Sequence, residues 1–295
     1  NVEVDIAIFS NLTPEHLDFH GDMENYFKAK LQLFQTLAVD KTAVINFDDP
    51  YAQRICSSIS AKCITYGMNK KADLHPVQAE FTTNGIKAQL QFREHIISID
   101  SLLLGEYNLS NIMAGVAAAL SMGVSISQIE NAVKNMPPIP GRMELISCDC
   151  PGKVFVDYAH SPDAYEKLFS SLSILTTGEV KLLTVFGCGG NRDSGKRSEM
   201  AKISEKYSAF SFITMDNPRN EDVENINADI IRGFSGDDFT VIPDRKEAIT
   251  TALKKMDENS ILLILGKGQE NYQEIGSVKI PYSDIEIIRA YSNES

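Results

Sequence analysis

The residues best suited to chemistry lie in four short segments, each of which follows a predicted strand in the second half of the chain. They read DYAHSPD at 157–163, GCGGNRDSGKR at 187–197, DNPR at 216–219 and GKGQE at 266–270. Carboxylates, an imidazole and cations in such segments can bind polar ligands, and the glycines let the backbone approach an anion closely. The 187–197 segment lacks the GxxxxGK[ST] spacing of a Walker A loop, so a flexible charged turn stays open as its other interpretation.

The first half of the chain offers a second set of candidates. His16 and His20 lie in the segment NLTPEHLDFHG at 11–21, and Lys30 follows inside a predicted helix. Two histidines near a lysine could hold or support an ion, but each could equally be structural, and a helical lysine is usually solvated.

The five cysteines are odd in number and form no CxxC pair; they are Cys56, Cys63, Cys148, Cys150 and Cys188. Without that spacing or a signal peptide, we expect free thiols in a reducing cytoplasm rather than disulfides or a zinc site. Cys188, in the glycine-rich segment, is either a nucleophile or a small residue that the turn tolerates.

Composition limits the classes of protein that can hold these segments. The chain has 295 residues, 43% of them hydrophobic and 23% charged, which excludes a largely disordered, collagen-like or coiled-coil protein. The formal net charge of −12 argues against a protein that coats nucleic acid. No apolar run approaches the ~18 residues of a membrane helix, so we expect no membrane partner. Because the chain opens with Asn1 directly in an apolar strand pattern, we expect it to be a fragment.

The first part of the chain predicts strands and helices in mixed order. Apolar spacing predicts a helix at 23–37, and Asp48 and Pro50 predict the start of another at 51–59. Alternation around Asn84-Gly85 predicts antiparallel strands within 74–100. Ser127 and Glu130 fit a capping box. The remaining predicted elements are strands at 43–46 and 63–66 and helices at 111–122 and 127–135.

The segment PPIPG at 137–141 cannot be helix or central strand, and we place a domain boundary there, giving domains 1–140 and 141–295. After it, predicted strands and helices alternate, which indicates an α/β domain with a mostly parallel sheet covered on both faces. Ligands of such sheets bind at the carboxyl ends of the strands, where the four polar segments lie. The strands are 154–158, 181–186, 211–215, 240–242 and 261–265, and the helices are 162–175, 198–207, 227–234, 245–256 and 284–291.

Taken together and in order, these motifs resemble the Mur ligase family, specifically the MurE type. Beyond the four segments, the resemblance rests on HLD and HGDME at 16–24, AK at 29–30, LGEYN with Asn111, and GRME at 141–144. It implies an α/β fold: the latter part of a central ATP-binding domain, followed by a complete Rossmann-like C-terminal domain. The family's GTxGKT phosphate loop and its uridine-binding domain are absent from these residues.

The resemblance implies an ATP-dependent amide ligase of cytoplasmic peptidoglycan synthesis, acting through an acyl phosphate with Mg²⁺. Its substrates would be ATP, meso-diaminopimelate and UDP-N-acetylmuramoyl-L-Ala-D-Glu. Lys30, carbamylated by CO2, and His16 would support the magnesium ion. The nucleotide would contact Asn108, Asn111, Arg142, Asp157 and His160, and the amino acid would contact Arg192, Asp216, Asn217, Arg219, Gly266 and Glu270. Gln269 stands where many relatives have histidine.

Other functions stay open from the sequence. The nearest are an L-lysine-adding MurE, another Mur-type ligase and a folylpolyglutamate synthase. A different class is a truncated module that binds diaminopimelate without turnover. A generic nucleotide-binding Rossmann protein lacks support because no GxGxxG follows a strand. We expect residues 1–295 alone to be catalytically inactive.

Overall fold

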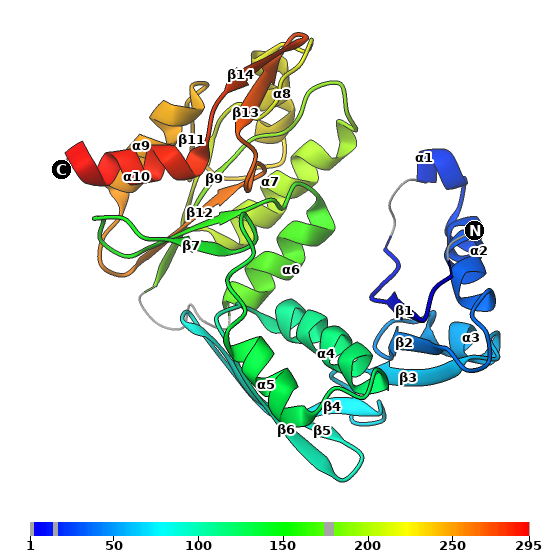
Figure 1. Cartoon of the computed structure of the whole chain (residues 1–295). Helices are drawn as coiled ribbons and strands as arrows, with labels where there is room; N and C mark the ends of the chain where they lie inside the picture. Colours follow the sequence, from blue (N-terminus) through cyan, green and yellow to red (C-terminus); the bar gives the residue numbers. More distant parts are fainter. Residues whose placement is uncertain (1–2, 14–16, 174–179, 295) are drawn as a thin grey trace. The chain divides into compact units, whose positions relative to one another are not determined.

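The computed structural model describes residues 3–13, 17–173 and 180–294, which form two compact units, Asn1–Pro137 and Pro138–Ser295. Each unit is built on its own six-stranded sheet (Figure 1). The predicted α/β class is therefore confirmed. No helix in the described ranges is long and apolar enough to cross a membrane.

The sheet of the first unit has its strands in sequence order, with parallel pairing in one half and antiparallel pairing in the other. β1 (Ile6–Phe9), β2 (Thr42–Asn46), β3 (Lys62–Tyr66) and β4 (Leu74–Thr82) pair in parallel. β4, β5 (Gly85–Phe92) and β6 (His95–Ser101) form the predicted antiparallel part.

Helices cover both faces of this sheet, and the alternation of β2 shows how. Ala43 and Ile45 join a core with α2 (Met23–Gln35) and α3 (Ala52–Ser57), whereas Val44 joins one with α4 (Glu106–Ser121) and α5 (Ile126–Lys134). Because both faces are covered, β2 is buried almost throughout, as expected for a strand between helical layers. The short α1 (Leu17–His20) precedes α2.

Two predicted helix caps are wrong. The carboxylate of Asp48 does not cap α3; it accepts hydrogen bonds from the backbone N–H groups of Met68 and Asn69, at 2.6 and 3.1 Å. The capping box of α5 uses Ser125 and Gln128, two residues earlier than Ser127 and Glu130. Glu130 instead accepts from the backbone of Ser98 in β6. In both cases the carboxylate accepts a hydrogen bond from the backbone of another segment. Local sequence spacing cannot reveal such a partner.

The sheet of the second unit has the order β11-β10-β9-β12-β8-β7, and all its pairs are parallel except β7 with β8. The predicted strands correspond to β8 (Lys153–Asp157), β9 (Lys181–Phe186), β10 (Phe210–Ile213), β11 (Phe239–Val241) and β12 (Ser260–Leu265). The non-sequential order places β8, β9, β10 and β12 side by side, so their carboxyl ends share one edge.

Helices again lie on both faces of the sheet. α9 (Arg245–Lys255) and α10 (Asp284–Glu294) pack on one face through Ile249, Leu253 and Ile288. On the other face, Tyr165 of α6 (Pro162–Ser173) contacts the ring of Phe186. α7 (Gly195–Tyr207) packs between α6 and α8 (Val223–Ile231).

Three strands of this unit are missing from the prediction. β7 (Glu144–Ile146) is a three-residue edge strand, and β13 (Tyr272–Ile275) with β14 (Val278–Pro281) forms a separate hairpin. The hairpin turn is Gly276-Ser277, with Gly276 at φ +60°. Gly followed by Ser between apolar-polar segments is a recognised hairpin signal, so this hairpin is predictable from the sequence.

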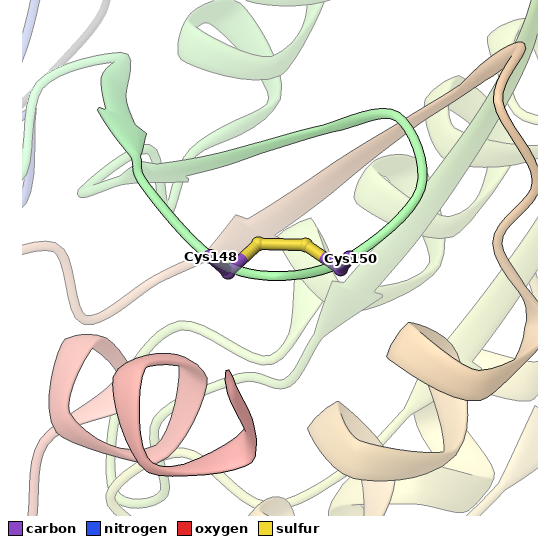
Figure 2. Close-up of a disulfide and its surroundings, with 2 residues drawn as sticks. All are labelled: Cys148 and Cys150. Carbon is purple, nitrogen blue, oxygen red and sulfur yellow. A yellow bond between two sulfur atoms is a disulfide. The ribbon is translucent and has the colours of Figure 1, made fainter. Parts of the chain in front are cut away.

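The expectation of free thiols is wrong for one pair of cysteines. Cys148 and Cys150, in the connection from β7 to β8, form a disulfide (Figure 2). The tight return of the chain holds their Cα atoms 5.4 Å apart, which is within the usual disulfide range. Cys56, Cys63 and Cys188 are free, and Cys188 is buried.

Candidate functional site

The segments that follow β9 and β10 pack closely against each other at two glycines, Gly187 and Gly190. A Cβ added to Gly190 would lie 1.9 Å from the carbonyl oxygen of Pro218, and one on Gly187 would lie 2.1 Å from that of Thr214. The Gly190 N–H donates to the carbonyl of Asn217 at 2.9 Å. These glycines are thus required for loop packing, which fixes the position of the 216–219 segment.

Lys267 is the centre of the polar cluster at this edge, although it is not among the predicted site residues. Its side chain is fully buried, and its ammonium group contacts Asn217 Oδ1 at 2.9 Å, Glu270 Oε2 at 3.2 Å and Asp216 Oδ1 at 3.4 Å. It also donates to the carbonyl of Tyr272 at 2.9 Å. A buried ammonium needs such partners, so this cluster unites three of the predicted amino-acid contacts around one cation.

Two further bonds complete this cluster. Asn217 donates from Nδ2 to Glu270 Oε2 at 3.0 Å, and its Oδ1 accepts from the backbone of Glu274. Gly266 has a φ of +108° and packs against Asp216. A Cβ on Gly266 would come within 2.7 Å of Asp216 Oδ2. The structure therefore brings Asp216, Asn217, Gly266 and Glu270 together.

Arg219 ends the same loop and is bound to β13. It has φ +52°, a left-handed conformation that is uncommon for arginine. Its Nε donates to Glu274 Oε2 at 3.1 Å and its Nη1 to the carbonyl of Gly190 at 2.9 Å. Glu274 was missed in the sequence because the β13–β14 hairpin was missed. The guanidinium of Arg219, a predicted amino-acid contact, thus has a carboxylate partner within the chain.

The three cations of the 187–197 segment have different positions. Arg192 is exposed on the loop. The Lys196 ammonium donates to the carbonyl of His160 at 2.8 Å. The guanidinium of Arg197 is buried and binds Glu221 and Asp229, at 2.6 and 3.0 Å, so it holds α7 to α8 and the preceding loop. Arg197 therefore has a structural role.

The carboxylate of Asp157, at the end of β8, accepts hydrogen bonds from two backbone N–H groups. Its two carboxylate oxygens accept from the N–H groups of Met143 and Ala159, both at 2.7 Å. Burial raises the pKa of Asp157, and these two bonds oppose that effect. Arg142 and His160 are exposed nearby: the Arg142 guanidinium lies 5.0 Å from the ring centre of Tyr158, and the His160 ring lies 4.9 Å from it. Asp157, Arg142 and His160 are thus grouped around one tyrosine.

In the first unit, the predicted site residues form two separate groups. Lys30 is exposed on α2, 5.4 Å from the centre of the Tyr26 ring, which stacks on His20. Asn108 is buried at the start of α4, where its Nδ2 donates to the carbonyl of Leu104 and its Oδ1 accepts from exposed Asn111.

The predicted magnesium ligands, His16 and carbamylated Lys30, stay a prediction. His16 lies outside the described residues. Within the described ranges, no three His, Cys, Asp or Glu side chains gather in a way that could hold a metal ion.

Comparison with known families assigns both halves of the chain. Residues 1–119 match the model of the Mur ligase middle domain, and residues 141–268 match that of the Mur ligase glutamate ligase domain. The chain belongs to the Mur ligase family. The resemblance drawn from the motifs is thereby confirmed.

Curated relatives show which branch of the family the chain is similar to. It is 38% identical over 290 residues to a UDP-N-acetylmuramoyl-L-alanyl-D-glutamate–2,6-diaminopimelate ligase of Clostridium acetobutylicum. It is 40% identical over 295 residues to the protein of that name from Trichormus variabilis. Each alignment covers 98% of this chain but 59% of the relative, so the chain spans about three fifths of the relatives' length.

Solved structures agree with this assignment. A structure of a UDP-N-acetylmuramoyl-L-alanyl-D-glutamate–2,6-diaminopimelate ligase superposes with a TM-score of 0.68 at 35% identity, covering 99% of this chain and 61% of that one. A folylpolyglutamate synthase of Mycobacterium tuberculosis superposes at 0.71 with 19% identity, covering 90% and 61%. At that identity the second match shows a shared fold only.

Proposed function

We propose that this chain is the amino-acid-binding and nucleotide-binding part of an ATP-dependent ligase that adds meso-diaminopimelate to UDP-N-acetylmuramoyl-L-Ala-D-Glu. The observation that supports this most is the cluster of Asp216, Asn217 and Glu270 around Lys267, beside Arg219. The curated relatives carry the name of the same activity. The reaction belongs to peptidoglycan precursor synthesis, on which cell-wall growth, cell shape and division depend, and we place it in the cytoplasm.

The reaction that we propose has two steps. The carboxylate of the dipeptide attacks the γ-phosphate of ATP and gives an acyl phosphate and ADP. The amine of diaminopimelate then attacks the acyl carbon, and the tetrahedral intermediate collapses with loss of phosphate. Phosphoryl and acyl oxygens gain negative charge in these steps, so fixed cations near them stabilise the transition states.

We assign the amino-acid end to the second unit. Arg192, Asp216, Asn217, Arg219, Gly266 and Glu270 would contact diaminopimelate. The charges of Asp216, Glu270 and Glu274 are balanced by Lys267, Arg192 and Arg219, which suits a doubly zwitterionic ligand. The planar fork of Arg219 is held in place by Glu274 and Gly190, so little entropy is lost when it binds a carboxylate.

We assign the nucleotide contacts to Asn108 and Asn111 in the first unit and to Arg142, Asp157 and His160 in the second. Exposed Asn111, Arg142 and His160 can reach a ligand directly. Buried Asp157 would act by holding the backbone of Met143, next to Arg142. Lys30, as a carbamate, and His16 would support Mg²⁺.

The test compares two amino acids in the protein extended to the full length of its relatives. We expect kcat/KM for meso-diaminopimelate to exceed that for L-lysine by about 10⁴-fold, because lysine lacks the carboxylate that Arg219 would bind. Arg219→Ala should remove most of this ratio. Arg232→Ala, at an arginine whose side chain is 74% exposed, should leave it unchanged.

Equal use of L-lysine would identify a lysine-adding enzyme. Binding of diaminopimelate without release of phosphate would identify a non-catalytic module. Residues 1–295 contain no GTxGKT loop, and we expect no turnover from them alone.

A further inference from the structure

Two free thiols of the first unit lie in contact. Cys56 is near the end of α3, and Cys63 is the second residue of β3. The intervening turn brings their Sγ atoms to 2.7 Å. This is about 0.7 Å longer than the ~2.05 Å of a disulfide bond, so small side-chain rotations suffice to join them.

Both thiols are open to reagents. Cys63 is exposed and Cys56 is half-buried, whereas the remaining free thiol, Cys188, is buried. The pair does not fit a metal site, because no third His, Cys, Asp or Glu joins it within the described ranges. The arrangement therefore suits chemistry between the two sulfurs themselves.

We propose that Cys56 and Cys63 form a reversible intramolecular disulfide by exchange with a small-molecule disulfide. The Cys56 thiolate attacks one sulfur of the reagent, which gives a mixed disulfide and releases one thiol. The Cys63 thiolate then attacks the Cys56 sulfur, which closes the protein disulfide and releases the second thiol. The two cysteines are oxidised, the reagent is reduced to two thiols, and the two cysteine protons pass to those products.

The surroundings support this order of attack. The hydrogen bond from Cys63 lowers the pKa of Cys56, and the same contact together with burial raises that of Cys63. The thiolate is the attacking form, so Cys56 reacts first. Cytosolic disulfides are usually transient, which agrees with a bond that glutathione or thioredoxin can open again.

The bond would join the end of α3 to the start of β3. The same helix is already tied to α2, because Arg54 binds Glu24 through two hydrogen bonds of 2.9 and 2.8 Å. Oxidation would therefore add a covalent link at the C-terminal end of α3, whose middle is already held to α2 by Arg54. We expect it to raise the thermal midpoint of the first unit by a few degrees and to leave that of the second unit unchanged.

Trypsin offers a direct readout, because Arg54, Lys62 and Lys70 place the two cysteines in separate peptides, 55–62 and 63–70. The native 295-residue chain is incubated with oxidised glutathione, alkylated, digested without reductant and analysed by mass spectrometry. We expect the two peptides to be joined in more than half of the molecules, and to separate after dithiothreitol. Cys188→Ser should give the same result.

Cys63→Ser should instead stop at a glutathione adduct on Cys56. Recovery of both peptides singly alkylated, or each as a stable glutathione adduct, would overturn the proposal. So would joining that occurs only in urea, because the native contact would then have no part in it.

Discussion

At the residue scale, the candidate site depends on one cation, Lys267, whose role is not evident from the sequence. The GKGQE segment predicts a polar loop, but its spacing gives no sign that Lys267 is buried. Its burial follows from the hairpin β13–β14, which was not predicted and which supplies the carbonyl of Tyr272 and the backbone of Glu274. Residue types and loop positions were thus predictable, whereas the partners that fix them were not.

Replacing Lys267 by Met tests this role. The change keeps the volume of the side chain but leaves Asp216 and Glu270, whose side chains are 9% and 19% exposed, without their cation. Removing one partner of a buried ion pair costs about 3–5 kcal/mol, and we expect the free energy of unfolding of the second unit to fall by that amount. Denaturant unfolding measures it.

Lys206→Met is the matched control. Lys206 pairs with Glu166 at 2.6 Å, but both side chains are largely exposed, so its loss should cost no more than ~1 kcal/mol. If Lys267→Met and Lys206→Met lowered the free energy of unfolding equally, the burial of Lys267 would contribute nothing to stability.

Lys30 gives a second prediction at this scale. On α2 it is exposed beside Tyr26, which is the position of an ordinary solvated lysine. If it is carbamylated in the full-length ligase, Lys30→Ala should lower kcat/KM by roughly 10²–10³-fold, the usual effect of losing one group that stabilises charge. Short carboxylic acids should restore part of the rate.

Lys28→Ala, at an exposed lysine two residues away on α2, should retain full activity. Full activity of Lys30→Ala would instead leave Lys30 as a solvated residue.

At the element scale, periodicity located most of the helices and strands but not the residues that join them. The apolar stripe of α2 and the buried run of β12 are visible in the sequence. The caps of α3 and α5 were misplaced because Asp48 and Glu130 bind backbone groups from other segments. β7 was missed because three residues are too few to show a period.

The connection of α7 to α8 leads to a prediction on pH. The Arg197 guanidinium, with help from the Asn191 N–H, lowers the pKa of Glu221 to about 2 from its ordinary 4.5. A lowered carboxyl pKa adds stability that is fully present above about pH 4.5 and is lost as the pH falls toward 2. Glu221→Gln should therefore lower the free energy of unfolding near pH 7 by about 1–3 kcal/mol.

The difference between wild type and Glu221→Gln should shrink steadily below pH 4.5, which unfolding curves across this range would show. Glu258→Gln, at an exposed position on the same unit, serves as the control. A difference that stays constant with pH would contradict the ionic origin of the effect.

At the scale of the whole molecule, the chain divides between Pro137 and Pro138, inside the segment PPIPG. Each unit has its own sheet and its own hydrophobic cores. Such a boundary can be seen in a sequence because proline and glycine interrupt the apolar periodicity of both helices and strands. The non-sequential strand order of the second unit cannot be predicted from the sequence, because it depends on contacts between segments far apart in the chain.

This division predicts that residues 138–295 fold and bind meso-diaminopimelate without the rest of the chain. All six residues proposed to contact the amino acid lie in this unit, and Lys267, Glu274 and Gly190, which hold them, lie there too. We expect isothermal titration to give the same Kd for residues 138–295 as for the 295-residue chain, within about threefold. A chain starting at residue 160 lacks β7 and β8, which leaves β12 without a neighbour on one side, and it should not fold. A folded second unit with no affinity for diaminopimelate would show that the amino-acid site needs residues outside it.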